Sequence, residues 1–115
     1  VGESKMKYSF DINGSPDETA RVAVTDIAQL LNAIYFTNNG KPAIALLITC
    51  ETNQVRFCLG GSTPTQGDSG LGHILYVGQS LRLTSPLAIR TFKYINHTNG
   101  SNAFLQLTPE YSIGA

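Results

Sequence analysis

The sequence contains no tryptophan, few charged side chains and no long hydrophobic run. Eight basic and eight acidic residues make up 14% of the 115 positions and are scattered singly along the chain. Because no basic stripe is available to neutralise phosphates or anionic lipid headgroups, we expect no binding to nucleic acids or membranes. The longest apolar stretch, residues 43–48, is far shorter than the roughly 20 residues that a membrane span requires.

Length and composition favour one folded domain. A chain of 115 residues is close to the commonest domain size, and 42% of hydrophobic residues is too high a fraction for a disordered segment. Residues 1–6 lack the apolar core of a signal peptide and begin with valine, so we interpret them as an N-terminal arm or tag remnant. We assign residues 7–111 to the domain and residues 112–115 to a C-terminal tail.

Short strand-like segments separated by turn residues predict an all-β fold. Candidate strands cover residues 6–12, 18–24, 43–50, 54–59, 73–77, 80–83, 89–95 and 103–107. One helical turn, capped by Thr25 or Asp26, fits residues 25–34, although the chain from Tyr35 could equally begin a strand. Strands at this spacing, without alternating helices, predict a β-sandwich or jelly roll of about eight short antiparallel strands with at most one short helical turn.

The only cysteines, Cys50 and Cys58, are expected to be free thiols. If Thr52 and Asn53 form the turn of a hairpin between residues 43–50 and 54–59, the two cysteines point to opposite faces of the sheet. Thiols on opposite faces cannot reach disulfide distance, and free thiols are typical of a reducing compartment. A β-bulge in either strand would change this parity and leave a disulfide open.

Few residue patterns suggest catalysis or metal binding. His73 could act near neutral pH, but no second histidine, cysteine or acidic residue stands near it at a zinc-like spacing. We therefore interpret His73 as a residue that fastens a loop through hydrogen bonds. Asp68, Ser69 and His73 resemble the members of a serine triad, but the strand-turn-helix elbow that presents such a nucleophile is missing. We expect no enzyme activity, no metal and no cofactor.

The segment at residues 60–72 is a long loop with five glycines, which predict unusual backbone angles. Loops of this length usually persist for a functional reason. We expect this loop and the N-terminal arm to be mobile and to supply the contacts to partners, because the strands use their apolar faces for the core, where residues such as Leu46, Ile48, Phe57 and Leu105 should stabilise the fold. Exchanging residues 63–69 for a short glycine-serine linker should therefore leave the melting temperature within a few degrees of the parent. The predicted partner-binding residues are Thr63, Pro64, Thr65, Gln66, Asp68 and Ser69 in the loop, and Lys5 and Lys7 near the N-terminus.

A series of strand and turn residues in the second half of the chain has a recognisable order and spacing. The series is Val55-Arg56-Phe57, Gly61, Thr63-Pro64-Thr65, Gly72-His73-x-Leu75, Gly78, Leu81-x-Leu83, Ile89, Phe92, Ile95, Ala103-x-Leu105-x-Leu107-Thr108 and Tyr111. It resembles a pattern found in small virion proteins of tailed bacteriophages that are similar to head decoration, or cement, proteins. The resemblance covers residues 54–111 and transfers no individual functional residue.

The resemblance implies a non-enzymatic structural protein that binds the outer surface of a phage head and stabilises it. Its partners would be the major capsid protein or other virion subunits, it would form a homo-trimer, and it would be assembled into the virion in the bacterial cytoplasm. Two alternatives remain open. One is another neck, tail or fibre component; the other is a carbohydrate-binding β-sandwich, although that class usually displays an aromatic platform and the five tyrosines are dispersed along this sequence.

Overall fold

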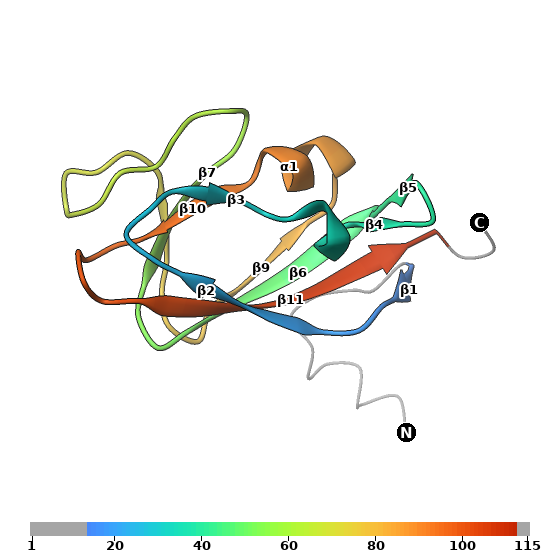
Figure 1. Ribbon diagram of the computed structural model, residues 1–115, viewed down its shortest axis with the longest axis horizontal. Coiled ribbons are helices and arrows are strands. Elements are labelled where there is room, and N and C mark those ends of the chain that lie inside the picture. The colour runs from blue at the N-terminus through green and yellow to red at the C-terminus, as the bar shows by residue number, and fades with distance from the viewer. Residues whose placement is uncertain (1–13, 113–115) are drawn as a thin grey trace, which may run out of the picture.

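The computed structural model describes residues 14–112, which form two antiparallel sheets packed as a sandwich (Figure 1). The first sheet contains β1 (Ser15–Pro16), β2 (Ala20–Val24), β6 (Ala45–Glu51), β9 (Ser80–Leu83) and β11 (Ala103–Tyr111). Its order is β1-β11-β6-β9, and β2 also pairs with β11. These sheets confirm the predicted all-β sandwich.

The second sheet and a separate hairpin complete the strands. The sheet has the order β3-β10-β7-β8, with bounds Gln29–Leu30, Lys93–Asn96, Val55–Cys58 and His73–Leu75, respectively. Strands β4 (Thr37–Asn38) and β5 (Lys41–Pro42) pair only with each other among the described residues. The strand predicted at residues 6–12 lies outside the described residues.

Within residues 14–112, two segments are helical where the sequence predicted at most one. A 3₁₀ helix at Ala33–Tyr35 is capped by the Asn32 side chain, which accepts a hydrogen bond from the Ile34 amide at 3.1 Å. The cap is therefore neither Thr25 nor Asp26, as was predicted. The second segment, α1, spans Pro86–Thr91. No helix in the described part of the chain is long and apolar enough to cross a membrane.

Helix α1 shows that the strand predicted at residues 89–95 was wrong in its first half. Ser85 caps the helix by accepting a hydrogen bond from the Ala88 amide at 3.4 Å, and Pro86 occupies the first turn, where its missing N–H costs nothing. Ile89 is buried against the core. A buried apolar residue at this position is compatible with a helix as well as with a strand, so the apolar pattern alone did not distinguish the two. The strand itself, β10, begins only at Lys93.

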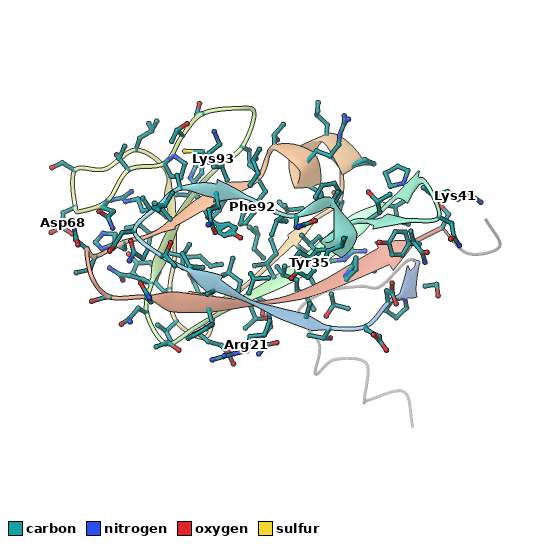
Figure 2. All side chains as sticks on the ribbon, in the orientation of Figure 1. Arg21, Tyr35, Lys41, Asp68, Phe92 and Lys93 are labelled. Atoms are coloured by element: carbon teal, nitrogen blue, oxygen red, sulfur yellow. The ribbon has the colours of Figure 1, made fainter. Side chains whose placement is uncertain are left out.

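Alternating residues of the two sheets fill the space between them. Strand β6 contributes Leu46 and Ile48, and β11 contributes Leu105, all three fully buried. Phe57 of the second sheet lies 5.3 Å from the Phe92 ring, centroid to centroid, and Phe92 points between the layers in Figure 2. The four residues expected to stabilise the fold, Leu46, Ile48, Phe57 and Leu105, thus all belong to the core.

The predicted hairpin between residues 43–50 and 54–59 does not form. Strand β6 pairs with β11 and β9, whereas β7 pairs with β10 and β8, so the short connection passes from one sheet to the other. Thr52 turns the chain at a φ of 79°, a region that β-branched residues rarely adopt. The Asn53 side chain fixes this corner by donating to the Asn102 carbonyl at 2.7 Å. Because both neighbours of β6 come from elsewhere in the sequence, no position beside it remains for β7.

Both cysteines are free, as the sequence predicted but for a different reason, and both are buried. They belong to different sheets rather than to two faces of one hairpin. Cys50 lies in the core, and burial first and the neighbouring Glu51 charge second raise the pKa of its thiol to about 11. The reactive thiolate form of Cys50 is therefore scarce near neutral pH.

We expect neither thiol of the folded protein to react quickly with an alkylating reagent at neutral pH, because both are buried. In denaturant, without any reductant, both should be labelled. Intact mass spectrometry after alkylation under the two conditions measures this. Rapid labelling of the folded protein would contradict the burial, and a denatured protein that takes label only after reduction would contradict the free thiols.

Candidate interaction site

The loop at residues 60–72 lies over the outer face of the second sheet, where the buried side chain of Arg56 holds it. Arg56 points away from the core, on the opposite face of β7 from Phe57, yet is only 6% exposed. Its Nη1 donates to the Gly72 carbonyl at 2.6 Å, and its Nη2 donates to the carbonyls of Gly67 at 2.9 Å and Asp68 at 3.3 Å. One guanidinium therefore binds three backbone carbonyls of the loop.

Further hydrogen bonds pin the first part of the loop. Lys93 Nζ donates to Thr63 Oγ1 at 3.0 Å, and the Gly60 amide donates to Thr91 Oγ1 at 3.1 Å. Within the loop, Thr65 Oγ1 accepts from the Leu71 amide at 2.7 Å. The loop is thus attached to β10 and to the end of α1, and it closes on itself.

Two glycines allow this close packing. A Cβ at position 70 would lie 2.2 Å from the Thr65 carbonyl oxygen. A Cβ at position 72 would lie 2.8 Å from the Phe57 carbonyl oxygen, and Gly72 has a φ of 119°. These positions require glycine because any side chain would collide with backbone. The unusual backbone angle that the glycine-rich composition predicted is present at Gly72.

The Asp26 carboxylate accepts hydrogen bonds from three donors, one of which belongs to the loop. Asp26 Oδ1 accepts hydrogen bonds from Asn96 Nδ2 at 2.8 Å, the Gly100 amide at 2.8 Å and Gln66 Nε2 at 3.1 Å. Gln66 also donates to the buried Asn96 side chain. The hydrogen bonds from Gly100 first and from Asn96 second lower the pKa of Asp26; desolvation opposes them, and the bond from Gln66 lowers the pKa further. The carboxylate therefore stays ionised and joins three segments of the chain.

The histidine that fastens the loop is His97, not His73. The buried His97 accepts a hydrogen bond at its carbonyl from the Gly67 amide at 2.8 Å, and its Nδ1 lies 2.9 Å from Gln54 Nε2. His73 is exposed and its ring packs on Phe57 at a centroid distance of 5.4 Å. The prediction for His73 was wrong because its place beside the loop in the sequence said nothing about which histidine the loop folds onto.

The structure does not assemble a triad from Asp68, Ser69 and His73. The fully exposed Asp68 carboxylate faces His97, with 3.5 Å between Oδ1 and Nε2, and Figure 2 places Asp68 at the outer end of the loop. Within residues 14–112, no group of three or more histidine, cysteine, aspartate or glutamate side chains could hold a metal ion.

The predicted partner-binding residues fall into four groups. The side chains of Thr63, Thr65, Asp68 and Ser69 are exposed, Pro64 is buried, and Gln66 is half-buried in the Asp26 cluster. Lys5 and Lys7 lie outside the described residues. The loop is not the mobile segment that the sequence predicted, because its hydrogen bonds hold it on the sheet.

Sequence reasoning missed the residues that hold the loop, namely Arg56, Asp26, Asn96 and His97. One signal was present. Arg56 interrupts an otherwise apolar strand, Val55–Cys58, and an arginine in such a strand needs several acceptors if it is buried. The sequence could not name these acceptors, because backbone carbonyls are present at every residue.

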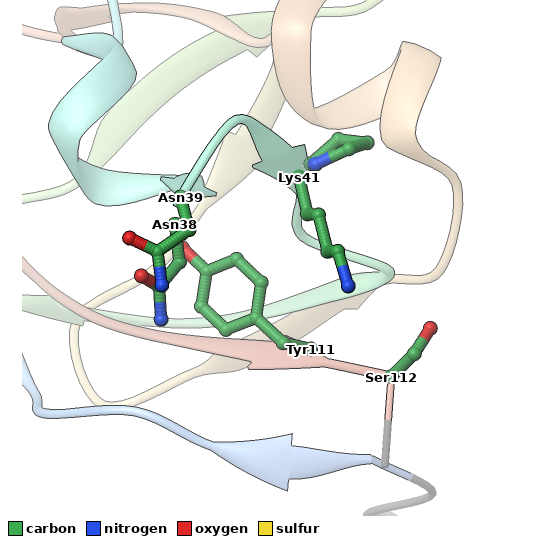
Figure 3. Close-up of a pocket in the computed structure, with 6 residues that line it drawn as sticks. Asn38, Asn39, Lys41, Tyr111 and Ser112 are labelled. Carbon is green, nitrogen blue, oxygen red and sulfur yellow. The ribbon is translucent and has the colours of Figure 1, made fainter. Parts of the chain in front are cut away.

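Hollows in the described part of the chain also lie away from the loop. A pocket of about 120 Å³ is lined by Asn38, Asn39, Lys41, Pro42, Tyr111 and Ser112, and in Figure 3 the Tyr111 ring stands between the two asparagines and Lys41. A wider groove of about 500 Å³ runs where β2 approaches β3 and is lined by Val22, Ala23, Gln29, Leu30, Asn32, Tyr35 and Tyr94. Among known proteins, no family model, curated protein or solved structure matches this chain.

Proposed function

We propose that this chain is a non-enzymatic structural protein of a virion, which binds the outer surface of a bacteriophage head and stabilises it. The observation that carries the proposal is the loop at residues 60–72, held in one conformation by Arg56 while Thr63, Thr65, Asp68 and Ser69 face outward. A surface that is ordered before binding loses little conformational entropy when it binds. The resemblance of residues 54–111 to decoration proteins supports capsid subunits as the class of protein that this surface binds.

The proposed partners are the major capsid protein or other virion subunits, and the proposed assembly is a homo-trimer. Ile27, Leu30 and Ile34 support self-association, because these large apolar side chains are exposed in the single chain and follow one another along one segment. In the proposed setting, the protein assembles on the head in the bacterial cytoplasm and remains in the virion. Light scattering of the purified chain and of its complex with heads tests the trimer.

Co-sedimentation with purified phage heads, before and after expansion, tests the function. We expect the protein to pellet with heads, and the variant Asp68→Ala/Ser69→Ala to bind about tenfold or more weakly, because exposed loop side chains make the contacts. The matched control is Glu18→Ala/Thr37→Ala, which also removes one exposed carboxylate and one exposed hydroxyl but far from the loop. The control should bind like the parent.

Two results would count against the proposal. Binding to tails or fibres instead of heads would assign the chain to another virion component. Equal binding by the loop variant and the parent would move the contacts away from the loop.

A second candidate, carbohydrate binding, is favoured by the groove beside β2 and β3. Tyr35 and Tyr94, which are far apart in the sequence, line this groove together with the amides of Gln29 and Asn32. The half-buried Tyr35 ring, flanked by these amides, suits the apolar and hydroxyl-bearing faces of sugars, whereas Tyr94 is only 4% exposed. Saturation-transfer NMR with a panel of oligosaccharides tests this function, and Tyr35→Ala should abolish any signal that arises in the groove.

A further inference from the structure

The sequence contains three asparagine-glycine pairs, Asn13-Gly14, Asn39-Gly40 and Asn99-Gly100. In such a pair the backbone nitrogen of glycine can attack the side-chain carbonyl carbon of asparagine, because glycine has no side chain to hinder the approach. The reaction also needs a backbone N–H that is free of a strong hydrogen bond. By local sequence alone, the three pairs are equivalent.

The structure distinguishes the three glycine amides. The Gly100 amide donates to the ionised Asp26 carboxylate at 2.8 Å, and the Gly14 amide donates to Glu110 Oε1 at 3.3 Å. No acceptor for the Gly40 amide is present among residues 14–112. Hydrogen bonds to a charged acceptor are stronger than neutral ones, so Asn39-Gly40 is the pair whose nucleophile is least restrained.

The position of Asn39-Gly40 in the fold also favours reaction. The pair forms the turn between β4 and β5, with φ values of 52° and 76°, as in the asparagine-glycine hairpin turns of other proteins. Each strand of this hairpin has only two residues, all exposed. A hairpin this short opens readily without unfolding the rest of the domain, so Asn39 can adopt the geometry of attack.

We propose that Asn39 is a site of spontaneous deamidation in the folded protein and that Asn99 is protected. The Gly40 nitrogen forms a bond to the Asn39 side-chain carbon, the bond to the amide nitrogen breaks, and ammonia leaves with the proton that the backbone nitrogen loses. Water then opens the resulting succinimide at either carbonyl. The products are aspartate or isoaspartate, and no oxidation or reduction occurs.

The product changes the pocket that Asn39 helps to line. A neutral amide becomes a carboxylate in the pocket that also contains Lys41 and Tyr111 (Figure 3). The chain as a whole, whose formal net charge is zero, gains one negative charge. The modified protein is therefore separable by isoelectric focusing.

The test compares the sites under folded and denaturing conditions. The purified chain is incubated in mildly alkaline buffer at body temperature, and the modified asparagines are identified by peptide mapping. In the folded protein we expect Asn39 to react roughly tenfold or more faster than Asn99, the protection that a hydrogen bond to a carboxylate gives. In concentrated urea the two sites should react at similar rates. The variant Asn39→Gln should lose the early charge shift.

The variant Asp26→Ala removes the acceptor of the Gly100 amide and should speed modification of Asn99, leaving Asn39 unchanged. If this variant does not fold, the comparison of folded and denatured parent protein still decides. The proposal is overturned if Asn99 reacts as fast as Asn39 in the folded protein. It is also overturned if Asn39 reacts only in urea.

Discussion

Replacing Arg56 with alanine is expected to lower the free energy of unfolding by about 3–5 kcal/mol. The substitution removes the guanidinium that donates to the carbonyls of Gly67, Asp68 and Gly72, and of these only the Gly67 carbonyl keeps a backbone donor among the described residues, the Gly70 amide at 3.0 Å. Arg56 Nε is buried without a hydrogen-bond partner among the described residues. The cost of burying this unpaired N–H offsets part of the stabilisation that the three hydrogen bonds provide. Arg56→Met, which keeps much of the packing, should therefore cost less than Arg56→Ala.

Urea denaturation of Arg56→Ala and the parent measures this change. The matched control is Arg90→Ala, because Arg90 is exposed on α1 and its loss should change the free energy of unfolding by no more than about 0.5 kcal/mol. Limited proteolysis gives a second readout, since a released loop should be cut between residues 60 and 72. Equal midpoints and an uncut loop in Arg56→Ala would show that other contacts hold the loop.

The same contacts change what a loop replacement should do. From the sequence, exchanging residues 63–69 for a short glycine-serine linker was expected to leave the melting temperature nearly unchanged. That expectation assumed a mobile loop. The exchange would in fact remove Gln66 from the Asp26 cluster and Thr63 from Lys93, so single exposed side chains such as Asp68 are the better probes of binding.

Replacing Glu110 with alanine should have a similarly large effect, about 3–5 kcal/mol. Arg82 Nε lies 3.0 Å from Glu110 Oε2 and its Nη2 lies 2.9 Å from Oε1, with the side chains only 15% and 2% exposed. The pair spans β6 on the outer face of the first sheet. Removing the carboxylate takes away one counter-charge of a largely buried guanidinium and the acceptor of the Gly14 amide, which is more costly than losing the attraction alone.

A second arginine-glutamate pair on the same face provides the matched control. Arg21 Nε lies 3.2 Å from Glu51 Oε1, with side chains 51% and 41% exposed. Because water screens this pair, Glu51→Ala should cost no more than about 1 kcal/mol. Urea denaturation midpoints of Glu110→Ala and Glu51→Ala measure the difference between the two costs. Equal costs would mean that burial does not strengthen the dependence on Glu110, and the double variant Arg82→Met/Glu110→Leu should recover part of the loss.

The sequence by itself determined the fold class and most of the strands. Alternating and apolar segments bounded by turn residues located the strand Ser80–Leu83 at its observed bounds and Ala45–Glu51 to within two residues. Side-chain alternation also placed Leu46, Ile48, Phe57 and Leu105 in the core. These features depend on neighbours a few residues apart, which a sequence displays directly.

Only the tertiary structure decided which strands pair and which polar groups meet. Strand β7 joins a different sheet from β6 because β9 and β11, distant in sequence, occupy both sides of β6. Arg56, Asp26 and His97 find partners that are 11, 74 and 43 residues away in the sequence, respectively. A long-range contact of this kind also binds the Gly100 amide to Asp26. The Gly40 amide has no such acceptor among the described residues. Hydrogen-bond partners are set by distance in space, and nothing in the local pattern of residues specifies that distance.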